Sequence, residues 1–430
     1  MQCKHFGVCG GCTLPGVPYA EQLAKKRQDL SRLLRLDVPP LIPSPSESGF
    51  RCKVAFVFGS GPSGNPSTRI AGAGTPAPSL RAGGLVMGHY ALESQRIVPI
   101  AECPVHHERG NRIAFALRDH LSRVTAITPL LRHVVIRATA DGREASAMLV
   151  VRRNDKALRA PIRKFLASSE KPDGFFINIH DRPGPFMVGD ETIKIEGRSH
   201  VKEIVGGMSY LVSPTAFFQT NVGAAAVLVK LVLEEVGPAK TVLDLYCGSG
   251  LFSLQLAKAG ARVTGVEENR QAIKDAEANL RLNRLPEGQV RFIAGRVEEV
   301  IRLKAATTVD AVVLDPPRQG CPARVLSAVF EQLRPSRAVY VSCNPDALSK
   351  ELPGILKAGY GVRRVQAVDM FPHTNHIETV MTFERGRSPL RSSYGGQATP
   401  PASSSSHRPS SPPLPRPTSR RRIGRGKRSG

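Results

Sequence analysis

The sequence lacks any run of about 18 consecutive apolar residues, the shortest stretch that ordinarily crosses a bilayer as a helix. Its first residues, Met1 to Gly16, also lack the apolar segment of a secretion signal. We therefore expect a cytoplasmic chain without a membrane span. With 430 residues, of which 41% are hydrophobic, the chain is long enough to form two or three packed domains.

Acidic residues are scarce as well. The chain has 36 Asp and Glu against 60 Lys and Arg, which gives a net charge of +24. Such an excess attracts polyanions, and nucleic acid is the polyanion we expect, because we find no basic amphipathic helix suited to a membrane surface. An Arg-rich genome is the simpler alternative explanation. Residues 386–430 are rich in Ser, Pro and Arg and cannot bury a core, so we expect a disordered basic tail there.

Changes in composition divide the rest of the chain into three parts. Residues 1–104 hold five of the eight cysteines, a predicted helix over Tyr19–Leu36 and a long Gly- and Ser-rich loop, Gly59–Gly84, that joins two predicted strands. Residues 105–235 are expected to form a central α+β domain. The strands predicted in these two parts are Lys53–Phe58, Leu85–His89, Val134–Ala138, Ala145–Val151 and Gly174–Ile179.

Residues 236–385 show a different pattern, in which short apolar strands alternate with helices. The predicted helices are Phe252–Ala259 and Asn269–Leu285, and the predicted strands are Thr241–Leu245, Arg262–Val266, Asp310–Leu314, Ala338–Ser342 and Val380–Phe383. This alternation predicts a Rossmann-like, doubly wound α/β domain. Ligands of such sheets bind at the carboxyl ends of the strands, so the residues just after the strands are the candidate site residues.

The first strand of this domain runs into a glycine turn, Asp244–Gly250 (Asp-Leu-Tyr-Cys-Gly-Ser-Gly), before a helix. Glycines there let a ligand approach the backbone closely. A dinucleotide site would have a third glycine where Ser253 stands, and Asp244 would repel a pyrophosphate. Asp244 suits instead the ammonium group of S-adenosylmethionine (SAM), and Glu267, after the next strand, suits its ribose hydroxyls. We expect SAM; NAD and a turn without cofactor are the alternatives.

Three further segments lie next to predicted strands at this edge: Asp315–Arg318 (Asp-Pro-Pro-Arg), Ser342–Pro345 (Ser-Cys-Asn-Pro) and His376–Thr379 (His-Ile-Glu-Thr). Enzymes that methylate amino groups commonly have an aromatic residue where Arg318 stands, which argues against that chemistry. Cys343 is a candidate nucleophile, and a carboxylate such as Glu378 is a candidate general base. Methylation of C5 of uracil needs this pair, because a thiolate must add to C6 and a base must later remove the C5 proton.

With these motifs the chain resembles the RNA uracil-C5 methyltransferases of the RumA, RumB and TrmA type. The resemblance covers about residues 1–384 and includes Phe217–Asn221 (Phe-Phe-Gln-Thr-Asn). It implies a SAM-dependent transferase that forms 5-methyluridine, with Cys343 as the nucleophile and Glu378 as the proton acceptor. It further implies that the target base is held by Phe217 and Arg318, and that SAM is bound by Gln219, Tyr246, Leu251, Glu267 and Asp315.

Two positions depart from the family pattern. Leu251 stands where Asn is usual after the glycine turn, and Gly295–Arg296 stands where a polar SAM contact is usual. These departures affect the expected contacts to adenosine and leave the pair of Cys343 and Glu378 untouched.

The N-terminal cysteines form a separate candidate site. Cys3, Cys9 and Cys12 have the spacing C-x5-C-x2-C, and Cys103 follows farther along the chain. Clustered cysteines in a cytosolic chain suggest a metal site, and four thiolates suit either zinc or an iron–sulfur cluster. Spacing alone leaves both open. The resemblance implies a [4Fe-4S] cluster on these four cysteines, with a structural or RNA-orienting role, because methyl transfer needs no redox step.

The resemblance also bears on the RNA substrate. The bacterial tRNA enzyme of the family lacks the cysteines, and the RumA type has an N-terminal β-barrel that does not precede Cys3 here. The layout is thus closest to the RumB type, which implies 23S rRNA as the substrate, with tRNA as the alternative. An amino-methyltransferase and an inactive RNA-binding protein are the competing hypotheses. No obligate protein partner is expected.

Overall fold

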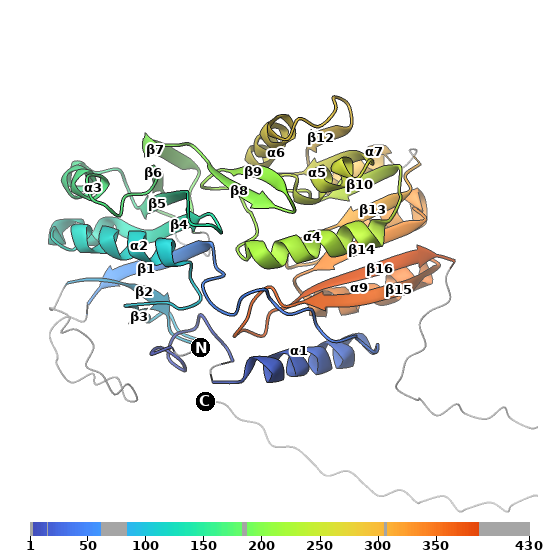
Figure 1. The fold of residues 1–430 in the computed structure, drawn as a ribbon, viewed down its shortest axis with the longest axis horizontal. Coiled ribbons are helices and arrows are strands. Elements are labelled where there is room, and N and C mark those ends of the chain that lie inside the picture. Colours follow the sequence, from blue (N-terminus) through green and yellow to red (C-terminus); the bar gives the residue numbers. More distant parts are fainter. Residues whose placement is uncertain (1–2, 15, 62–83, 183–186, 305–307, 387–430) are drawn as a thin grey trace, which may run out of the picture. The chain divides into compact units, whose positions relative to one another are not determined.

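The computed structural model describes residues 3–14, 16–61, 84–182, 187–304 and 308–386. Within these ranges, strands form two seven-stranded sheets and a two-stranded hairpin (Figure 1). Most of the loop expected over Gly59–Gly84, and all but the first residue of the expected basic tail, lie outside the described residues. None of the helices in these ranges is both long and apolar enough to cross a membrane.

The first sheet has the strand order β3-β2-β1-β4-β5-β6-β7. Its neighbours pair antiparallel except for β5 and β6, which are parallel. The strands are β1 (Lys53–Ser60), β2 (Leu85–Tyr90), β3 (Ile97–Pro99), β4 (Leu131–Ala138), β5 (Ala145–Val151), β6 (Gly174–Ile179) and β7 (Glu191–Gly197). The division expected between residues 104 and 105 falls inside this sheet, because β3 and β4 come from either side of it.

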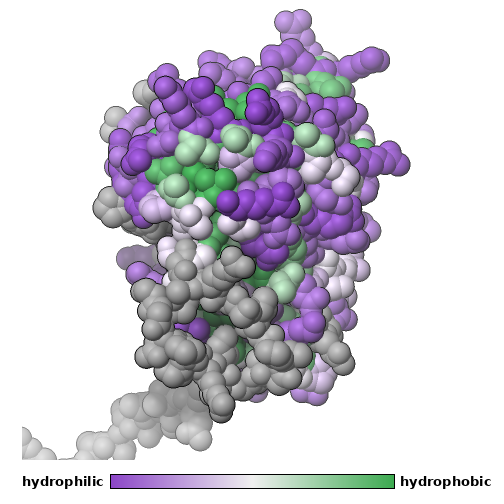
Figure 2. Space-filling model, turned by 90° about the vertical axis from the view of Figure 1, so that its left-hand side faces the viewer, coloured by the Kyte–Doolittle hydropathy of each residue, from purple (hydrophilic) through white to green (hydrophobic). Residues whose placement is uncertain are grey.

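Two helices, α2 (Glu108–Leu121) and α3 (Arg159–Leu166), and two short 3-10 turns, η1 (Thr125–Leu130) and η2 (Lys156–Leu158), accompany this sheet. From Val54 to Phe58 every second residue of β1 is buried, and Phe56 packs in one core with Leu117 of α2 and Phe165 of α3. Burying each such side chain stabilises the fold by roughly 1.5–3 kcal/mol. The outer surface on this side of the molecule is mainly hydrophilic, with an apolar patch in its upper half (Figure 2).

The hairpin of β8 (Val201–Val205) and β9 (Met208–Val212) follows the first sheet. Its turn consists of Gly206 and Gly207, both with positive φ (56° and 73°). A two-residue hairpin turn of this kind needs positive φ at both positions, which glycine adopts without strain. The buried side of the hairpin, which includes Tyr210, packs into the core of the second sheet.

The second sheet has the strand order β12-β11-β10-β13-β14-β16-β15. From β12 to β14 neighbouring strands are parallel, whereas β16 is antiparallel to both β14 and β15. The strands are β10 (Thr241–Leu245), β11 (Arg262–Glu267), β12 (Val290–Ala294), β13 (Ala311–Leu314), β14 (Arg337–Ser342), β15 (Tyr360–Val368) and β16 (Glu378–Arg385).

Helices cover both faces of this sheet (Figure 1). One core contains Val242 and Val313 of the strands with α4 (Val222–Val236) and α5 (Leu251–Lys258). The core on the opposite face contains Leu243 and Leu314 with helical residues. Its helices are α1 (Tyr19–Leu34), α7 (Val297–Lys304), α8 (Ala323–Ser327), the π-helical turn η3 (Ala328–Leu333) and α9 (Pro345–Lys357). The remaining helix, α6 (Arg270–Leu282), packs against β9, β11 and β12.

The expected doubly wound α/β fold is therefore confirmed, with helix and strand ends that differ by a few residues from the predicted ones. The helix predicted from Asn269 begins one residue later, because the Asn269 side chain accepts hydrogen bonds from the backbone N–H groups of Gln271 and Ala272 and so caps it. The strand predicted over Val380–Phe383 is longer and begins at Glu378, because Glu378 already pairs with Val368 of β15.

The N-terminal segment touches both sheets. Before α1, Cys9 forms a bridge with Ala91, just after β2. α1 itself packs beside α9. After α1, Ile42 pairs with Val368 at the end of β15, and Arg51 pairs with Asn221. The segment that carries the first three cysteines thus also reaches the edge where β15 and β16 connect.

Candidate functional site

The glycine turn after β10 has a backbone conformation that few residue types adopt without strain. Tyr246, Gly248 and Gly250 all have positive φ (66°, 54° and 87°). Across from it on β11, a Cβ atom on Gly265 would lie 2.9 Å from the Cys247 Sγ. Cys247 is itself buried. The turn and the end of β11 therefore approach each other closely, at the carboxyl edge where this fold binds its ligands.

Asp244, the last but one residue of β10, is fully buried with half of its carboxylate unsatisfied. Its Oδ2 accepts a hydrogen bond from Ser253 Oγ at 2.5 Å, whereas its Oδ1 has no partner among the described residues. Burial raises the pKa of Asp244 to about 7, against the lowering effect of Ser253. A buried acceptor without a donor costs free energy, and an incoming ammonium group would satisfy it.

Glu267 ends β11 and is held by two backbone donors. Its Oε2 accepts from the N–H of Gly248 at 3.1 Å, and its Oε1 accepts from the N–H of Asn269 at 2.7 Å. Each carboxylate oxygen keeps a further lone pair, so the side chain can also accept from two ribose hydroxyls. The carboxylates expected to receive the two ends of SAM thus stand on adjacent strands.

Cys343 and Glu378 meet at the same edge of the sheet. Ser342, the last residue of β14, pairs with Thr379 of β16. Because these strands are antiparallel, continuing the register by one residue places Cys343 opposite Glu378. Glu378 is buried, with 4% of its surface exposed, and Cys343 is partly buried.

The charges around this pair are mostly of one sign. The pKa of the Cys343 thiol is raised to about 11, mainly by burial and also by the neighbouring Glu378 and Asp315, against the lowering effect of Arg318. Burial likewise holds the pKa of Glu378 well above its usual range, with Asp315 adding to the rise. The pKa of Asp315 is raised to about 7 by burial and by Asp244 and Glu267. A cationic ligand would favour the ionised forms of all these groups.

Arg318 connects the two chemical motifs. Its side chain is exposed, and its charge lowers the pKa of both Cys343 and Glu378, so it lies near both. Its backbone carbonyl accepts a hydrogen bond of 2.8 Å from Asn344 Nδ2. Asn344 also caps α9 through the N–H of Asp346. The segments Asp315–Arg318 and Ser342–Pro345 are therefore tied together.

The segment Phe217–Asn221 presents its residues in different directions. Phe217 is 68% exposed, whereas Gln219 is 9% exposed. Between them, Phe218 packs against the buried Tyr210 with ring centroids 5.5 Å apart. Asn221 is buried and caps α4 by accepting from the N–H of Ala224. An exposed aromatic ring suits stacking on a base.

The other expected SAM residues, Tyr246 and Leu251, are packed against the two faces of the sheet. Tyr246 is partly buried against the core that contains α9. Leu251 begins α5, is 8% exposed and packs in the core that contains α4. Its carbonyl accepts a hydrogen bond from Tyr210 Oη at 3.2 Å. An apolar side chain at position 251 therefore fits its surroundings.

The four N-terminal candidates lie around one cavity. Cys3, Cys9, Cys12 and Cys103 all line a cavity of about 380 Å³ beside β2. Burial raises the pKa of Cys12 to about 11 and of Cys103 to about 12, and neighbouring thiols add to both shifts. The thiols are therefore close enough to repel one another as thiolates, which is the arrangement that a bound metal stabilises.

Several other residues of the cavity offer nitrogen atoms, although Glu93 and Glu102 also line it. The buried Nε2 of His5, Nε2 of His89 and Nε of Arg51 have no hydrogen-bond partner among the described residues. The sulfur atoms of an iron–sulfur cluster would accept from such groups. In the same cavity the ligand atoms of His89, Cys103 and His106 lie within 4.8 Å of one another. The residues present therefore fit a cluster, and a single metal ion is the alternative.

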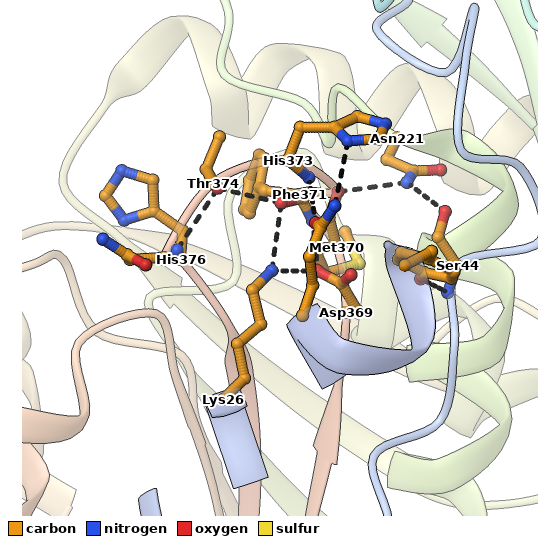
Figure 3. A network of polar contacts seen from close by, with 12 residues as sticks. Lys26, Ser44, Asn221, Asp369, Met370, Phe371, His373, Thr374 and His376 are labelled. Carbon is orange, nitrogen blue, oxygen red and sulfur yellow. Dashed lines mark hydrogen bonds and ion pairs between the residues drawn. The ribbon is translucent and has the colours of Figure 1, made fainter. Parts of the chain in front are cut away.

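Sequence reasoning missed the residues that hold the loop before Glu378. Lys26 and Gln22 of α1 are buried, and Lys26 Nζ donates to Asp369 Oδ1 at 2.8 Å (Figure 3). They lie at four-residue spacing with Leu30 and Leu34 on the buried side of the helix. Polar residues at that spacing are the signal that could have indicated a buried polar contact.

Comparison with known proteins identifies relatives over most of the chain. Residues 188–386 match the family model described as tRNA (Uracil-5-)-methyltransferase. An uncharacterized RNA methyltransferase of Gloeobacter violaceus is 32% identical over 395 residues, 88% of this chain and 81% of the relative. Another, from Geobacter sulfurreducens, is 32% identical over 397 residues, 88% of this chain and 76% of the relative.

A solved structure shows the same fold. The tRNA (uracil-54, C5)-methyltransferase of Pyrococcus abyssi, in complex with S-adenosyl-L-homocysteine, matches with a TM-score of 0.70 and 27% identity, over 88% of this chain and 86% of that one. The family and the SAM-dependent fold are thus established by sequence and by structure together. The chain belongs to the tRNA (uracil-5-)-methyltransferase family, whose members are SAM-dependent RNA methyltransferases.

Proposed function

We propose that this protein methylates C5 of a uridine in 23S rRNA, through a covalent bond between Cys343 Sγ and C6 of the base. The observation that carries the proposal is the register of β14 and β16, which sets Cys343 opposite Glu378 at the carboxyl edge of the sheet. Methylation of C5 requires a nucleophile and a general base that can both reach the same nucleobase.

The reaction begins with the Cys343 thiolate adding to C6, which makes C5 carbon-nucleophilic. SAM, when bound, supplies an electrophilic methyl group on its sulfonium. C5 would take that methyl group as its bond to the sulfonium sulfur breaks, with neutral S-adenosyl-L-homocysteine as the leaving group, and C5 then carries both the methyl group and its original hydrogen. The Glu378 carboxylate removes this proton, the C5=C6 bond re-forms, and the Cys343 thiolate is released. Atoms and charge balance, because the thiolate is regenerated and the proton passes to Glu378 and then to water.

The electrostatics of the site support a cationic cofactor. Asp315, Glu378 and the Cys343 thiol all have pKa values raised by burial and by one another, with Arg318 as the opposing charge. A sulfonium near them favours the ionised thiolate and carboxylates that the reaction uses. The unsatisfied Asp244 Oδ1 would receive the ammonium group, and Glu267 the ribose hydroxyls. The pyrophosphate of a dinucleotide would be repelled by the same groups.

Two side chains would hold the target base. Phe217 is exposed and can stack on it, and Arg318 can stack or donate to a uracil carbonyl. Gln219, Tyr246, Leu251 and Asp315 would complete the surroundings of SAM, with Leu251 contributing packing rather than a polar contact. Reaching Cys343 requires the uridine to leave its stack, which costs least for a loop base.

The four cysteines Cys3, Cys9, Cys12 and Cys103 would hold a [4Fe-4S] cluster. Their common cavity and the unpartnered nitrogen atoms around it support this assignment. The methyl transfer involves no electron transfer, so the cluster would stabilise the N-terminal segment and orient RNA. The alternative is zinc bound by Cys103, His89 and His106, which metal analysis would reveal.

The choice of 23S rRNA depends on the cysteines, which by resemblance the bacterial tRNA enzyme lacks. A tRNA substrate is the second candidate, favoured by the structural likeness to the tRNA (uracil-54, C5)-methyltransferase of Pyrococcus abyssi. The basic tail would add non-specific affinity for either RNA.

The decisive experiment uses RNA that contains 5-fluorouridine, because fluorine at C5 cannot be removed as a proton. Protein, SAM and either 23S rRNA or tRNA transcripts are incubated and run on a denaturing gel. A covalent band with 23S rRNA that disappears in Cys343→Ala is the expected result. A band with tRNA alone would move the proposal to the second substrate. The absence of a band with either RNA would contradict the covalent mechanism and favour amino-methylation or binding without catalysis.

A further inference from the structure

The loop between β15 and β16, residues 369–377, delivers Glu378 to the active site. It is hydrogen-bonded to Thr13 and Leu14, to helix α1 and to Asn221. Its contacts with Lys26 of α1 and with Asn221 are drawn in Figure 3. The position of the Glu378 carboxylate relative to Cys343 therefore depends on how firmly this loop is held.

His373 is the centre of these contacts. Its carbonyl accepts from the backbone N–H groups of Thr13 and Leu14 at 2.9 and 3.0 Å. Its own N–H donates to Gln22 Oε1 at 2.8 Å, and its Nδ1 lies 3.2 Å from Gln22 Nε2. Its Nε2 lies 2.9 Å from the Glu47 carbonyl oxygen. The backbone and the ring of His373 thus form contacts with the segment after Cys12, with α1 and with Glu47, which follows α1 in the sequence.

The conformation of His373 shows that these contacts are needed. It is 4% exposed and has a φ of 66°, in the left-handed region. A non-glycine residue in this region is strained and persists where its surroundings over-determine it. The bonds to Thr13, Gln22 and Glu47 are those surroundings. Without them the turn would relax, and the chain leading to Glu378 would move with it.

The turn that follows His373 is fixed by hydroxyl groups. Thr374 Oγ1 donates to the Phe371 carbonyl at 2.8 Å and accepts from the His376 N–H at 3.2 Å. The N–H of Asn375 donates to Thr13 Oγ1 at 3.0 Å. Thr13, which directly follows Cys12, therefore contacts the loop through both its backbone and its side chain.

The start of the loop is held from two other sides. Lys26 Nζ donates to Asp369 Oδ1 at 2.8 Å and to the Phe371 carbonyl at 3.2 Å. Asn221 Nδ2 donates to the Met370 carbonyl at 3.0 Å and to Ser44 Oγ at 3.0 Å. These contacts fix where the loop leaves β15, whereas Thr13 and His373 fix the half of the loop that runs toward Glu378.

We propose that His373 is a positioning residue for Glu378, through which the segment after Cys12 holds the base in place for proton removal. The inference rests on the proposed function, in which Glu378 takes the C5 proton. It connects the cysteine cavity to catalysis by a structural route: Cys12 lines the cavity, Thr13 holds His373, and His373 sets the turn before Glu378.

The proposal predicts which step fails when the contacts are removed. The addition of Cys343 to C6 and the methyl transfer do not need the carboxylate of Glu378, so both steps continue. Proton removal slows, and the covalent adduct between Cys343 and the methylated base accumulates on ordinary uridine RNA. A residue that served only folding would lower the amount of active protein without changing the fraction trapped as adduct.

The test compares Thr13→Val, Thr13→Ser and His373→Asn in full-length protein with matched metal content. Thr13→Val removes the acceptor for Asn375 and keeps the shape, Thr13→Ser keeps the acceptor, and Asn tolerates the left-handed backbone at 373. Thr241→Val is the matched control, since Thr241 Oγ1 bonds Asp310 at the amino end of β10. SAM with a radioactive methyl group and uridine RNA are used, and labelled protein–RNA adduct and kcat are measured together.

We expect Thr13→Val to lower kcat about tenfold, the effect of losing one well-placed hydrogen bond, with an unchanged KM for RNA and a rise in labelled adduct. Thr13→Ser should restore wild-type values, and His373→Asn should behave like Thr13→Val or more strongly. Unchanged kcat in His373→Asn, which loses the ring contacts with Gln22 and Glu47, or a fall in kcat without labelled adduct in either variant, would overturn the proposal. Absence of any adduct in wild-type protein with 5-fluorouridine RNA would instead overturn the proposed function, and this inference with it.

Discussion

Cys343 stands opposite Glu378 across two antiparallel strands, one residue beyond the last pair, Ser342 and Thr379. The two residues are far apart in the sequence but fall on adjacent strands because β16 inserts between β14 and β15. The insertion places a carboxylate from the last strand at an edge that is otherwise built by parallel strands. This relationship brings two different reactive groups, a thiol and a carboxylate, side by side at the carboxyl edge of the sheet.

Glu378→Gln should separate the two halves of the reaction. The amide keeps the size of the side chain but cannot accept the C5 proton, so turnover should fall by roughly 100- to 10,000-fold, the usual contribution of a general base. The covalent adduct should still form and should accumulate on uridine RNA. Denaturing gels with labelled RNA would measure it. Turnover close to that of the wild type would exclude Glu378 as the base.

Cofactor binding should depend on pH through Asp244. Its pKa in the ligand-free protein is raised to about 7, because it is buried, so its protonated fraction increases as the pH falls from 7 toward 5. An ammonium group favours the ionised form, and binding must then expel a proton. The affinity for S-adenosylhomocysteine, which has the same ammonium group, should therefore rise as pH increases from about 5 to 7 and then level off.

Titration calorimetry over this pH range would measure the effect. Asp244→Asn should weaken binding and flatten the pH dependence, whereas Asp37→Asn, at an exposed carboxylate, should leave both unchanged. A pH dependence that persists in Asp244→Asn would point to Asp315, whose pKa burial also raises to about 7.

Two neighbouring lysines of α1 offer a matched comparison of stability. The Lys26 side chain is 2% exposed and pairs with the fully buried Asp369, whereas Lys25 pairs with Asp29 at the surface. Lys26→Met leaves a buried carboxylate without its partner and should lower the free energy of unfolding by about 3–5 kcal/mol. Lys25→Met should change it by less than about 0.5 kcal/mol. Urea denaturation would compare them, and equal effects would contradict the burial of the first pair.

Phe217 should matter for RNA and not for SAM. The residue is 68% exposed beside buried neighbours, and stacking on a base is worth roughly 1–3 kcal/mol. Phe217→Ala should therefore raise KM for RNA about 5- to 150-fold at an unchanged affinity for S-adenosylhomocysteine. Leu282→Ala, at another exposed apolar residue, is the control. An equal rise in KM for both variants would argue against stacking.

Metal analysis should find iron in the cysteine cavity. Anaerobically purified protein should contain about four iron and four sulfide per chain, and Cys103→Ser should lose them. Cys52→Ala, at a buried cysteine of a different core, should keep them. Removing the iron should lower the midpoint of thermal unfolding, because a ligand bound by the native state stabilises it. About one zinc per chain without sulfide would contradict the cluster.

Much of the catalytic domain was predictable from local patterns. Apolar strands such as Thr241–Leu245 and Ala338–Ser342 are buried on both faces, so their composition alone indicates strands, and the motifs follow them directly. β15 was missed because Arg363 and Arg364 interrupt its apolar run, and they are exposed at the edge of the sheet. β12 was missed because only one of its residues is fully buried.

The N-terminal half was harder to predict. β3 has three residues, and β7 is largely exposed, so neither gives a clear apolar alternation. The buried Lys26 and Gln22 look like surface residues of an amphipathic helix until the loop that they contact is known. Contacts of this kind join residues separated by more than 300 positions, and no local pattern reveals them.

The sequence by itself determined the chemistry available to this protein: a thiol, carboxylates and a glycine turn at the ends of predicted strands, and four cysteines that suit a metal. Local residue types are enough for this, because strand ends and turns depend on neighbouring residues. Only the tertiary structure decided that Cys343 faces Glu378, that Asp244 keeps an unsatisfied oxygen, and that the stretch after Cys12 holds the turn before Glu378. These relations follow from strand insertion and burial, which depend on the whole packed chain.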